Sequence, residues 1–189
     1  MAIEVEIKVE IENPLGLEES ILDKGGELVK CESQEDLYLD HPQYSFADTD
    51  EALRIRKILA KTTSNEETVQ STQYELTYKG AKIDSRSKTR EELSVEVDSG
   101  ETMLAILKAV GFTDVATVRK ERTYFRMDGV SITIDSVEGL GWFLEIEQVV
   151  QDDEQVESSR DELFKLLDTL LSGEYESIRE SYLELLLSQ

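Results

Sequence analysis

The stretch EVEIKVEIE, residues 4–12, alternates charged and apolar side chains without a break. A period of two predicts a β-strand, with Val5, Ile7 and Val9 on an apolar face that meets a core. The charged face has two possible environments. It is exposed to solvent, as on most half-buried antiparallel strands, or it lines a cavity that binds a charged ligand. The other strands of the chain decide between these two interpretations.

Strand patterns recur along the chain. Beyond the first strand, they are predicted over residues 27–40, 51–59, 73–79, 91–97, 116–127, 130–137 and 142–150. Asp128-Gly129 has the residues of a tight hairpin turn. The polar segment 62–72 and the basic segment 79–90 are predicted to be loops, the second of them mobile. Short connections favour antiparallel pairing, and about eight strands are enough to close a barrel.

Helices are predicted between and after the strands. Their ranges are 13–26, 101–112, 158–171 and 174–187. Ser159 and Glu162 have the spacing of a capping box, and the last helix carries an apolar stripe. That stripe consists of Ile178, Tyr182, Leu185 and Leu186. No linker divides the chain, so we expect one α+β domain over residues 1–189, with the C-terminal helices, 157–188, as part of it.

The helices constrain the orientation of the sheet. Every predicted strand has one ionic face and one apolar face, and the helices need an apolar face to cover. If they cover the outside, the ionic faces line the interior of the closed sheet. The sequence therefore predicts an eight-stranded antiparallel closed barrel with a polar tunnel and with helices packed on its outside.

Composition limits the partners. The chain has 42 acidic and 20 basic residues, for a net charge of −22, which disfavours a nucleic-acid duplex or an anionic membrane as a partner. A single cysteine, Cys31, cannot form an internal disulfide, and a single histidine, His41, excludes a histidine-rich zinc site. The first residues show no leader pattern, so a soluble cytoplasmic protein is expected. The oligomeric state is left open, and a homodimer is compatible with the sequence.

Basic residues gather on the strand faces despite the acidic composition. Arg54 and Arg56 form one pair, and Lys120 and Arg122 form another. Arginine and lysine bind phosphate oxygens, while carboxylates are hard oxygen ligands for Mg²⁺ or Mn²⁺. Together they predict a site for a metal-bound polyphosphate. The alternative is a network of ion pairs between neighbouring strands, each worth little energy; the recurrence of the pattern on all the strands favours the binding site.

Seven motifs resemble one family in order along the chain. They are Glu4-x-Glu6-x-Lys8, LRIRK with Arg54 and Arg56, LTYKG with Lys79, REELSVEV with Glu92, KER with Lys120 and Arg122, ITIDSVEGLGWFLEIE with Asp135, Glu145 and Glu147, and SYLELLL. This set is similar to the CYTH superfamily, the triphosphate tunnel metalloenzymes. Within it the sequence most resembles the CyaB group of class IV adenylate cyclases, to which thiamine triphosphatases are related.

The resemblance implies roles for particular residues. Triphosphate-binding residues would be Lys8, Arg54, Arg56, Lys79, Lys120 and Arg122, with Arg90 and Arg126 as additional contacts. Metal ligands would be Glu4, Glu6, Asp135, Glu145 and Glu147. Glu4, Glu6, Lys8 and Glu92 would be catalytic, with Glu92 supporting the metal ligands or an attacking water. Lys82, Arg86 and Lys88 either close a lid over the mouth or are solvated loop charges.

Two reactions and two other kinds of protein stay open at this stage. The ribose 3′-hydroxyl of ATP could attack the α-phosphorus and give cyclic AMP, or water could hydrolyse the terminal phosphate of ATP, thiamine triphosphate or tripolyphosphate. No adenine-reading motif is recognisable. A non-catalytic polyphosphate sensor is disfavoured because an anion binder gains nothing from added carboxylates. A scaffold that uses the SYLELLL stripe is disfavoured because packing on the barrel already explains that stripe.

Overall fold

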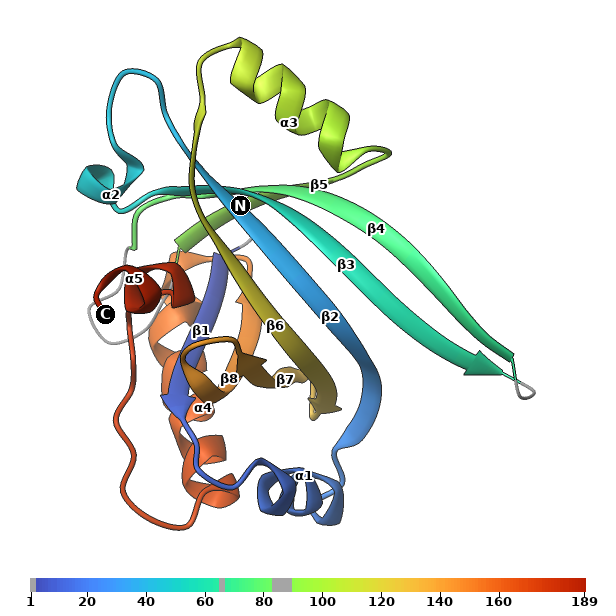
Figure 1. Ribbon diagram of the computed structural model, residues 1–189. Helices are drawn as coiled ribbons and strands as arrows, with labels where there is room; N and C mark the ends of the chain where they lie inside the picture. Colours follow the sequence, from blue (N-terminus) through green and yellow to red (C-terminus); the bar gives the residue numbers. More distant parts are fainter. Residues whose placement is uncertain (1–2, 65–66, 83–89) are drawn as a thin grey trace.

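A computed structural model describes residues 3–64, 67–82 and 90–189 of the chain. Its strands are β1 (Ile3–Glu10), β2 (Glu27–Asp40), β3 (Ala52–Ser64), β4 (Glu67–Lys79), β5 (Arg90–Val97), β6 (Thr113–Met127), β7 (Val130–Val137) and β8 (Gly141–Val150). They form a closed barrel in the order β1-β5-β4-β3-β2-β6-β7-β8 (Figure 1), and every neighbouring pair is antiparallel. The predicted eight-stranded α+β barrel is confirmed.

The hairpin of β3 and β4 is longer than predicted. Its register runs from Ala52 opposite Lys79 to Ser64 opposite Glu67, so the described part of the segment 62–72 is strand and not loop. That prediction was wrong because polarity was taken as a loop signal, although the segment is rich in β-branched threonine and valine, which favour strands. The paired ends of β3 and β4 extend away from the barrel (Figure 1).

The turn between β6 and β7 has the predicted geometry. Asp128 and Gly129 have φ angles of 50° and 83°. Both residues are therefore in the left-handed region that a two-residue hairpin turn with the native twist requires. The turn fixes the register of β7 on β6, in which Asp135 lies opposite Arg122.

Helices cover the apolar outer face of the barrel. Helix α1 (Pro14–Asp23) and helix α4 (Val156–Leu170) pack on the outward side chains of β1, β7 and β8. Helix α3 (Gly100–Ala109) and the short helix α2 (Phe46–Thr49) pack on the outward side of β2 and β3, where Leu39, Leu53 and Ile55 are buried. The apolar face of the opening stretch thus points outward, beneath helices, as predicted.

The C-terminal region differs from the prediction. Helix α4 follows a 3₁₀ turn, η1 (Asp153–Gln155), and begins at Val156, so Ser159 and Glu162 lie inside the helix and form no capping box. Only Tyr182–Leu187 is helical in the predicted segment 174–187; this is helix α5, and its capping box is formed by Ser181 and Glu184. Residues 171–181 cross the molecule without regular structure.

Helix α5 closes one end of the barrel. Tyr182 packs against the inward-facing side chains of Tyr38, Val118 and Phe143, and Ile178, Leu185 and Leu186 pack beside it. The predicted stripe therefore packs on the barrel, but at its end rather than on its outer wall. Barrel closure supplies the reason: inward residues at the end of a closed sheet need a cover that no neighbouring strand provides. Among the described residues, no helix is long and apolar enough to cross a membrane.

Candidate active site

The inward face of the barrel is charged and buried. Its buried side chains include Glu6, Lys8, Glu32, Gln34, Asp36, Arg54, Arg56, Thr77, Arg90, Lys120, Arg122, Thr133, Asp135 and Glu145. Buried charges of this density are costly unless they are paired or bind a ligand. These faces line a cavity of about 370 Å³, and residues of α2 and α5 also line it. The structure therefore confirms that the charged strand faces form an interior.

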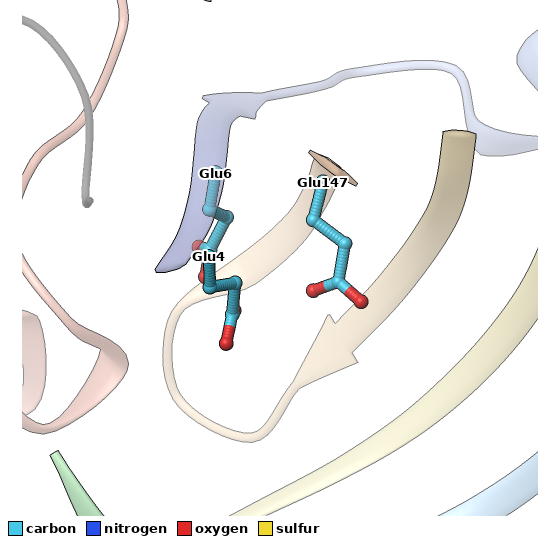
Figure 2. Close-up of side chains that lie close together, drawn as sticks. All are labelled: Glu4, Glu6 and Glu147. Atoms are coloured by element: carbon cyan, nitrogen blue, oxygen red, sulfur yellow. The ribbon is translucent and has the colours of Figure 1, made fainter. Parts of the chain in front are cut away.

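Three carboxylates converge on one side of the cavity. Glu4 and Glu6 come from β1 and Glu147 comes from β8, where the register places Glu147 opposite Glu6. One oxygen from each lies within 4.8 Å of the others (Figure 2). Burial, together with the neighbouring Glu6, raises the pKa of Glu147, and burial raises the pKa of Glu4. A divalent cation would relieve this repulsion, and carboxylate oxygens are the ligands that Mg²⁺ and Mn²⁺ prefer.

Glu92 and Lys79 lie beside this three-carboxylate cluster. Lys79 Nζ is 2.5 Å from Glu92 Oε2 and 3.9 Å from Glu4 Oε1. Burial would raise the pKa of Glu92, but Lys79 and Arg54 outweigh it and hold that pKa well below the usual range. Glu92 therefore stays ionised. A carboxylate this acidic is suited to orienting a hydroxyl or a water, and less suited to taking its proton.

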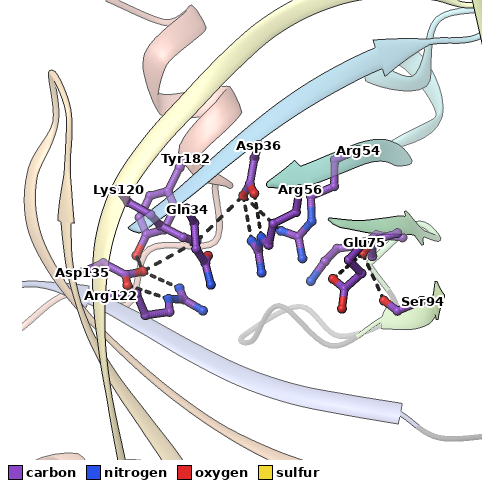
Figure 3. Close-up of polar contacts among 12 residues, drawn as sticks. Gln34, Asp36, Arg54, Arg56, Glu75, Ser94, Lys120, Arg122, Asp135 and Tyr182 are labelled. Atoms are coloured by element: carbon purple, nitrogen blue, oxygen red, sulfur yellow. Dashed lines mark hydrogen bonds and ion pairs between the residues drawn. The ribbon is translucent and has the colours of Figure 1, made fainter. Parts of the chain in front are cut away.

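Strands β2 and β3, which lie across the barrel from β1 and β8 in the strand order, carry Asp36 and the predicted pair Arg54 and Arg56 (Figure 3). Arg56 donates from Nε and Nη2 to the two carboxylate oxygens of Asp36, at 2.6 and 2.7 Å. Arg54 Nη1 lies 3.5 Å from Asp36 Oδ2. A bidentate arginine pair of this kind fixes the plane of the guanidinium group. Asp36 was not predicted as a site residue, yet it organises the predicted pair.

Arg122 is held by two of the predicted metal ligands. It donates from Nε to Asp135 Oδ1 at 2.6 Å, and its Nη2 contacts both Asp135 and Glu145. Tyr182 donates to Asp135 Oδ2 at 2.8 Å. Asp135 and Glu145 thus lie with the cations and outside the three-carboxylate cluster. The sequence shows that they are acidic and face inward, but the cross-strand register of β6, β7 and β8 decides their partner.

Lys120 lies between the two aspartates. Its Nζ is 4.0 Å from Asp36 Oδ2 and 3.9 Å from Asp135 Oδ2. Burial, reinforced by Arg122, lowers the pKa of Lys120 to about 7. An anion bound beside Lys120 would favour its charged form.

Lys8 is placed differently from the other predicted phosphate ligands. Its Nζ contacts the backbone oxygen of Glu180 and lies 4.3 Å from the centre of the Tyr182 ring. The amide of Ile178 donates to the backbone oxygen of Lys8 at 2.8 Å. Lys8 is fully buried and lies outside the set of residues that line the cavity. The C-terminal segment therefore engages both the backbone and the side chain of this residue.

Two further predicted cations, Lys82 and Arg90, lie near Asp50 at the end of α2. Lys82 Nζ is 2.8 Å from Asp50 Oδ1 and 3.2 Å from Glu184 Oε1, so it joins the end of α2 to α5 instead of being a solvated loop charge. Arg90 lines the cavity and contacts Asp50. Arg126 lies at another depression, beside Glu147. Arg86 and Lys88 fall outside the described residues, as does most of the predicted mobile loop.

Comparison with known proteins identifies the family. The model of the CYTH domain matches residues 2–182. The chain belongs to the CYTH family.

Similar proteins match this CYTH chain over nearly its whole length. A protein of Methanocaldococcus jannaschii named "Putative adenylate cyclase" is 38 % identical over 183 residues, which cover 97 % of this chain and 98 % of the relative. The structure of a protein from Pyrococcus horikoshii has a TM-score of 0.85 at 38 % identity and covers 98 % of both chains. An adenylyl cyclase-like protein of Hippeastrum, described as having a dominant triphosphatase activity, shares the fold, with a TM-score of 0.64 at 19 % identity over 100 % of this chain and 96 % of that one.

The CYTH cavity also has an apolar outer part, at the end of the barrel that α5 covers. Phe46 and Ala47 of α2, Val115 of β6, and Leu183 and Leu187 of α5 line it. No sequence pattern predicted this part, because its residues come from three short segments that are distant in the chain. Only the alternation of β2, which places Gln34, Asp36 and Tyr38 on the inward face with Glu32, could have pointed to Asp36.

Proposed function

We propose that this CYTH protein is a metal-dependent enzyme that binds a triphosphate in the barrel and converts ATP to cyclic AMP and pyrophosphate, as adenylate cyclases do. The observation that carries the proposal is the placement of a three-carboxylate cluster opposite buried arginines and a lysine in one cavity. That arrangement suits a divalent metal on one side of a polyphosphate and cations on the other. The name of the Methanocaldococcus jannaschii relative supports the reaction.

Unsatisfied polar atoms in the barrel support an anionic ligand. Within the described part of the chain, Arg54 Nε and the Thr133 hydroxyl are buried and have no hydrogen-bond partner. A buried donor without a partner costs roughly 1–3 kcal/mol, so such groups usually await an acceptor. Phosphate oxygens are strong acceptors, and arginine is suited to them. Arg54, which lines the cavity, therefore fits a phosphate oxygen, while Thr133 lies outside the cavity lining.

The metal fits the acidic side of the cavity. Glu4, Glu6 and Glu147 would hold one Mg²⁺ or Mn²⁺, because three carboxylates in reach of one another form a hard oxygen donor set. When bound, the metal would supply charge neutralisation to the phosphates. Glu145 and Asp135, which contact Arg122, would act on the metal site indirectly by orienting that arginine.

The protein groups have separate tasks in the proposed cyclisation. Arg54, Arg56 and Arg122 would bind phosphate oxygens and stabilise charge that develops on the leaving pyrophosphate. Glu92, held ionised beside Lys79, would orient the ribose 3′-hydroxyl whose oxygen attacks the α-phosphorus. As the new oxygen–phosphorus bond forms, the bond from the α-phosphorus to the bridging oxygen breaks and pyrophosphate leaves, while the proton of the 3′-hydroxyl passes to water. The apolar outer part of the cavity would receive the nucleoside.

Hydrolysis of the terminal phosphate is the second candidate reaction. The same cations and carboxylates would serve it, and the position of the triphosphate along the tunnel would decide which phosphorus is attacked. The Hippeastrum protein described as a dominant triphosphatase has the same fold. A non-catalytic sensor stays the third candidate.

Phosphorus NMR distinguishes these candidates. The protein is incubated with Mg²⁺ or Mn²⁺ and, separately, with ATP, thiamine triphosphate or tripolyphosphate, with Glu4→Gln as the control. Cyclic AMP with pyrophosphate supports the cyclase, and orthophosphate that is lost in the control supports the hydrolase. Binding of tripolyphosphate without turnover of any substrate would overturn the enzyme and support the sensor.

A further inference from the structure

Asp36 is an acidic residue on the inward face that the proposed reaction does not use. It lies in β2, is 1 % exposed, and is surrounded by the cations of β3 and β6. Neighbouring strands place Arg56 directly opposite Asp36, and Arg54 two residues further along β3. Lys120 lies on the other neighbouring strand. One carboxylate thus lies beside three of the predicted phosphate ligands.

The contacts of Asp36 leave part of each cation facing the cavity. Arg56 uses the edge formed by Nε and Nη2 for the carboxylate, at 2.6 and 2.7 Å. Its remaining N–H groups on Nη1 and Nη2 are not needed by that pair, and Arg56 lines the cavity. Arg54 uses Nη1 for Asp36, and its Nε has no partner. Asp36 therefore determines which edge of each guanidinium group is available to a ligand.

The carboxylate also stays charged in this environment. Burial opposes ionisation, but Arg56, Arg54 and Lys120 hold the pKa of Asp36 far below its usual range. A buried, ionised group with short bidentate bonds is a rigid anchor, because moving it breaks charge-assisted hydrogen bonds in a poorly solvated interior.

We propose that Asp36 is a positioning residue that fixes Arg54, Arg56 and Lys120 in the arrangement that receives the triphosphate. The inference rests on the proposed function, since it concerns the same cavity. A positioning role and a purely charge-balancing role predict opposite changes in anion affinity when Asp36 is mutated. Removing a negative charge from an anion site should tighten anion binding if Asp36 only neutralises the arginines, and should weaken binding if Asp36 positions them.

Two variants test the role of Asp36. Asp36→Asn removes the charge and keeps the shape, while Asp36→Glu keeps the charge and moves it by one methylene group. Calorimetry with tripolyphosphate in EDTA measures binding without turnover. We expect both variants to bind roughly 10- to 100-fold more weakly than the wild type, the loss typical when a buried group that orients a ligand-binding residue is altered. We also expect kcat to fall in the metal-loaded enzyme.

Controls separate this inference from a folding defect and from the proposed function. Glu35→Gln changes the next residue of β2, which is half exposed and pairs with the exposed Arg119, and it should change neither binding nor kcat. Thermal melting shows whether each variant is folded. Should Asp36→Asn fail to fold, Asp36→Glu still decides the question. Unchanged or tighter binding in a folded variant overturns the positioning role, whereas failure of the wild type to bind tripolyphosphate overturns the proposed function instead.

Discussion

Acidic residues on opposite sides of the cavity have different surroundings. Where β1 and β8 meet, Glu4, Glu6 and Glu147 lie within reach of one another, and the pKa values of Glu4 and Glu147 are raised. Across the cavity, Asp36 lies among arginines and its pKa is lowered. An acidic residue among cations is a structural counterion, whereas one among other acids is a candidate metal ligand. Position relative to the cations, and not residue type, therefore separates the two.

This difference predicts opposite responses to mutation. Removing an acid from the three-carboxylate cluster relieves repulsion, while removing an acid from among the arginines leaves buried cations without compensation. The first change should affect activity more than stability. The second should affect stability strongly.

Asp135→Ala should have the largest effect. Asp135 is fully buried and accepts from Arg122 and Tyr182, so its loss should reduce the free energy of unfolding by about 3–5 kcal/mol. Urea denaturation measures the loss. Asp114→Asn, which breaks an exposed pair with Lys108, should cost less than about 1 kcal/mol. Equal effects of the two variants would contradict the assignment of Asp135 as a buried counterion.

Glu6→Gln should reduce activity without reducing stability. We expect turnover to fall by roughly 100-fold or more, because a ligand of the proposed metal is lost. The free energy of unfolding without metal should stay the same or rise, since one repelling charge is gone from the cluster. Steady-state kinetics and urea denaturation provide the two readouts, with the exposed Glu10→Gln on the same strand as the control. A large loss of stability would show that Glu6 is a counterion like Asp135.

The effect of metal on melting should depend on pH. Because folding raises the pKa values of Glu4 and Glu147, these groups contribute stability below their unfolded pKa of about 4.3, and this is lost as pH rises through their folded values. Binding of Mn²⁺ by the ionised carboxylates should restore this lost stability. The stabilisation by Mn²⁺ over EDTA should therefore grow as pH rises above about 4.3 towards neutrality, reaching about 2.7 kcal/mol at a hundredfold excess over Kd.

Calorimetric melting at several pH values checks this prediction. In Glu147→Gln the stabilisation by Mn²⁺ should be smaller and should change less with pH. A stabilisation that is the same at all pH values, or that persists unchanged in this variant, would place the metal elsewhere.

Leu183→Ala should have the smallest effect. It tests whether the apolar outer part of the cavity contacts the substrate. If Leu183 contacts the organic end of the substrate, KM for ATP should rise roughly tenfold while KM for tripolyphosphate stays the same. Val95→Ala, at an exposed position on the outside of β5, is the matched control. Equal changes for both substrates would show that Leu183 acts only by packing α5 on the barrel.

Local sequence pattern was enough to predict the eight strands, their inward charged faces and the charged side chains of β1, β3 to β6 and β8 that line the cavity. A period of two places alternate side chains on opposite faces whatever the partner strands are, so Glu4, Glu6, Arg54 and Arg56 could be assigned to one face from local pattern alone. The apolar faces then required helices on the outside. Local capping was less predictable, because Ser159-x-x-Glu162 and Ser181-x-x-Glu184 show the same signal and only the second begins a helix.

Only the tertiary structure decided which inward charges meet. Register between strands distant in the sequence places Glu147 beside Glu6, and gives Arg122 to Asp135 and Glu145. It also makes Asp36 the anchor of the arginine pair, although its strand carries no basic motif of its own. Lys8 contacts a backbone oxygen of the C-terminal segment, and no sequence pattern predicts this contact. The physical reason is that side-chain direction is a local property of the backbone, whereas the free energy of a buried charge depends on neighbours that only the folded barrel brings together.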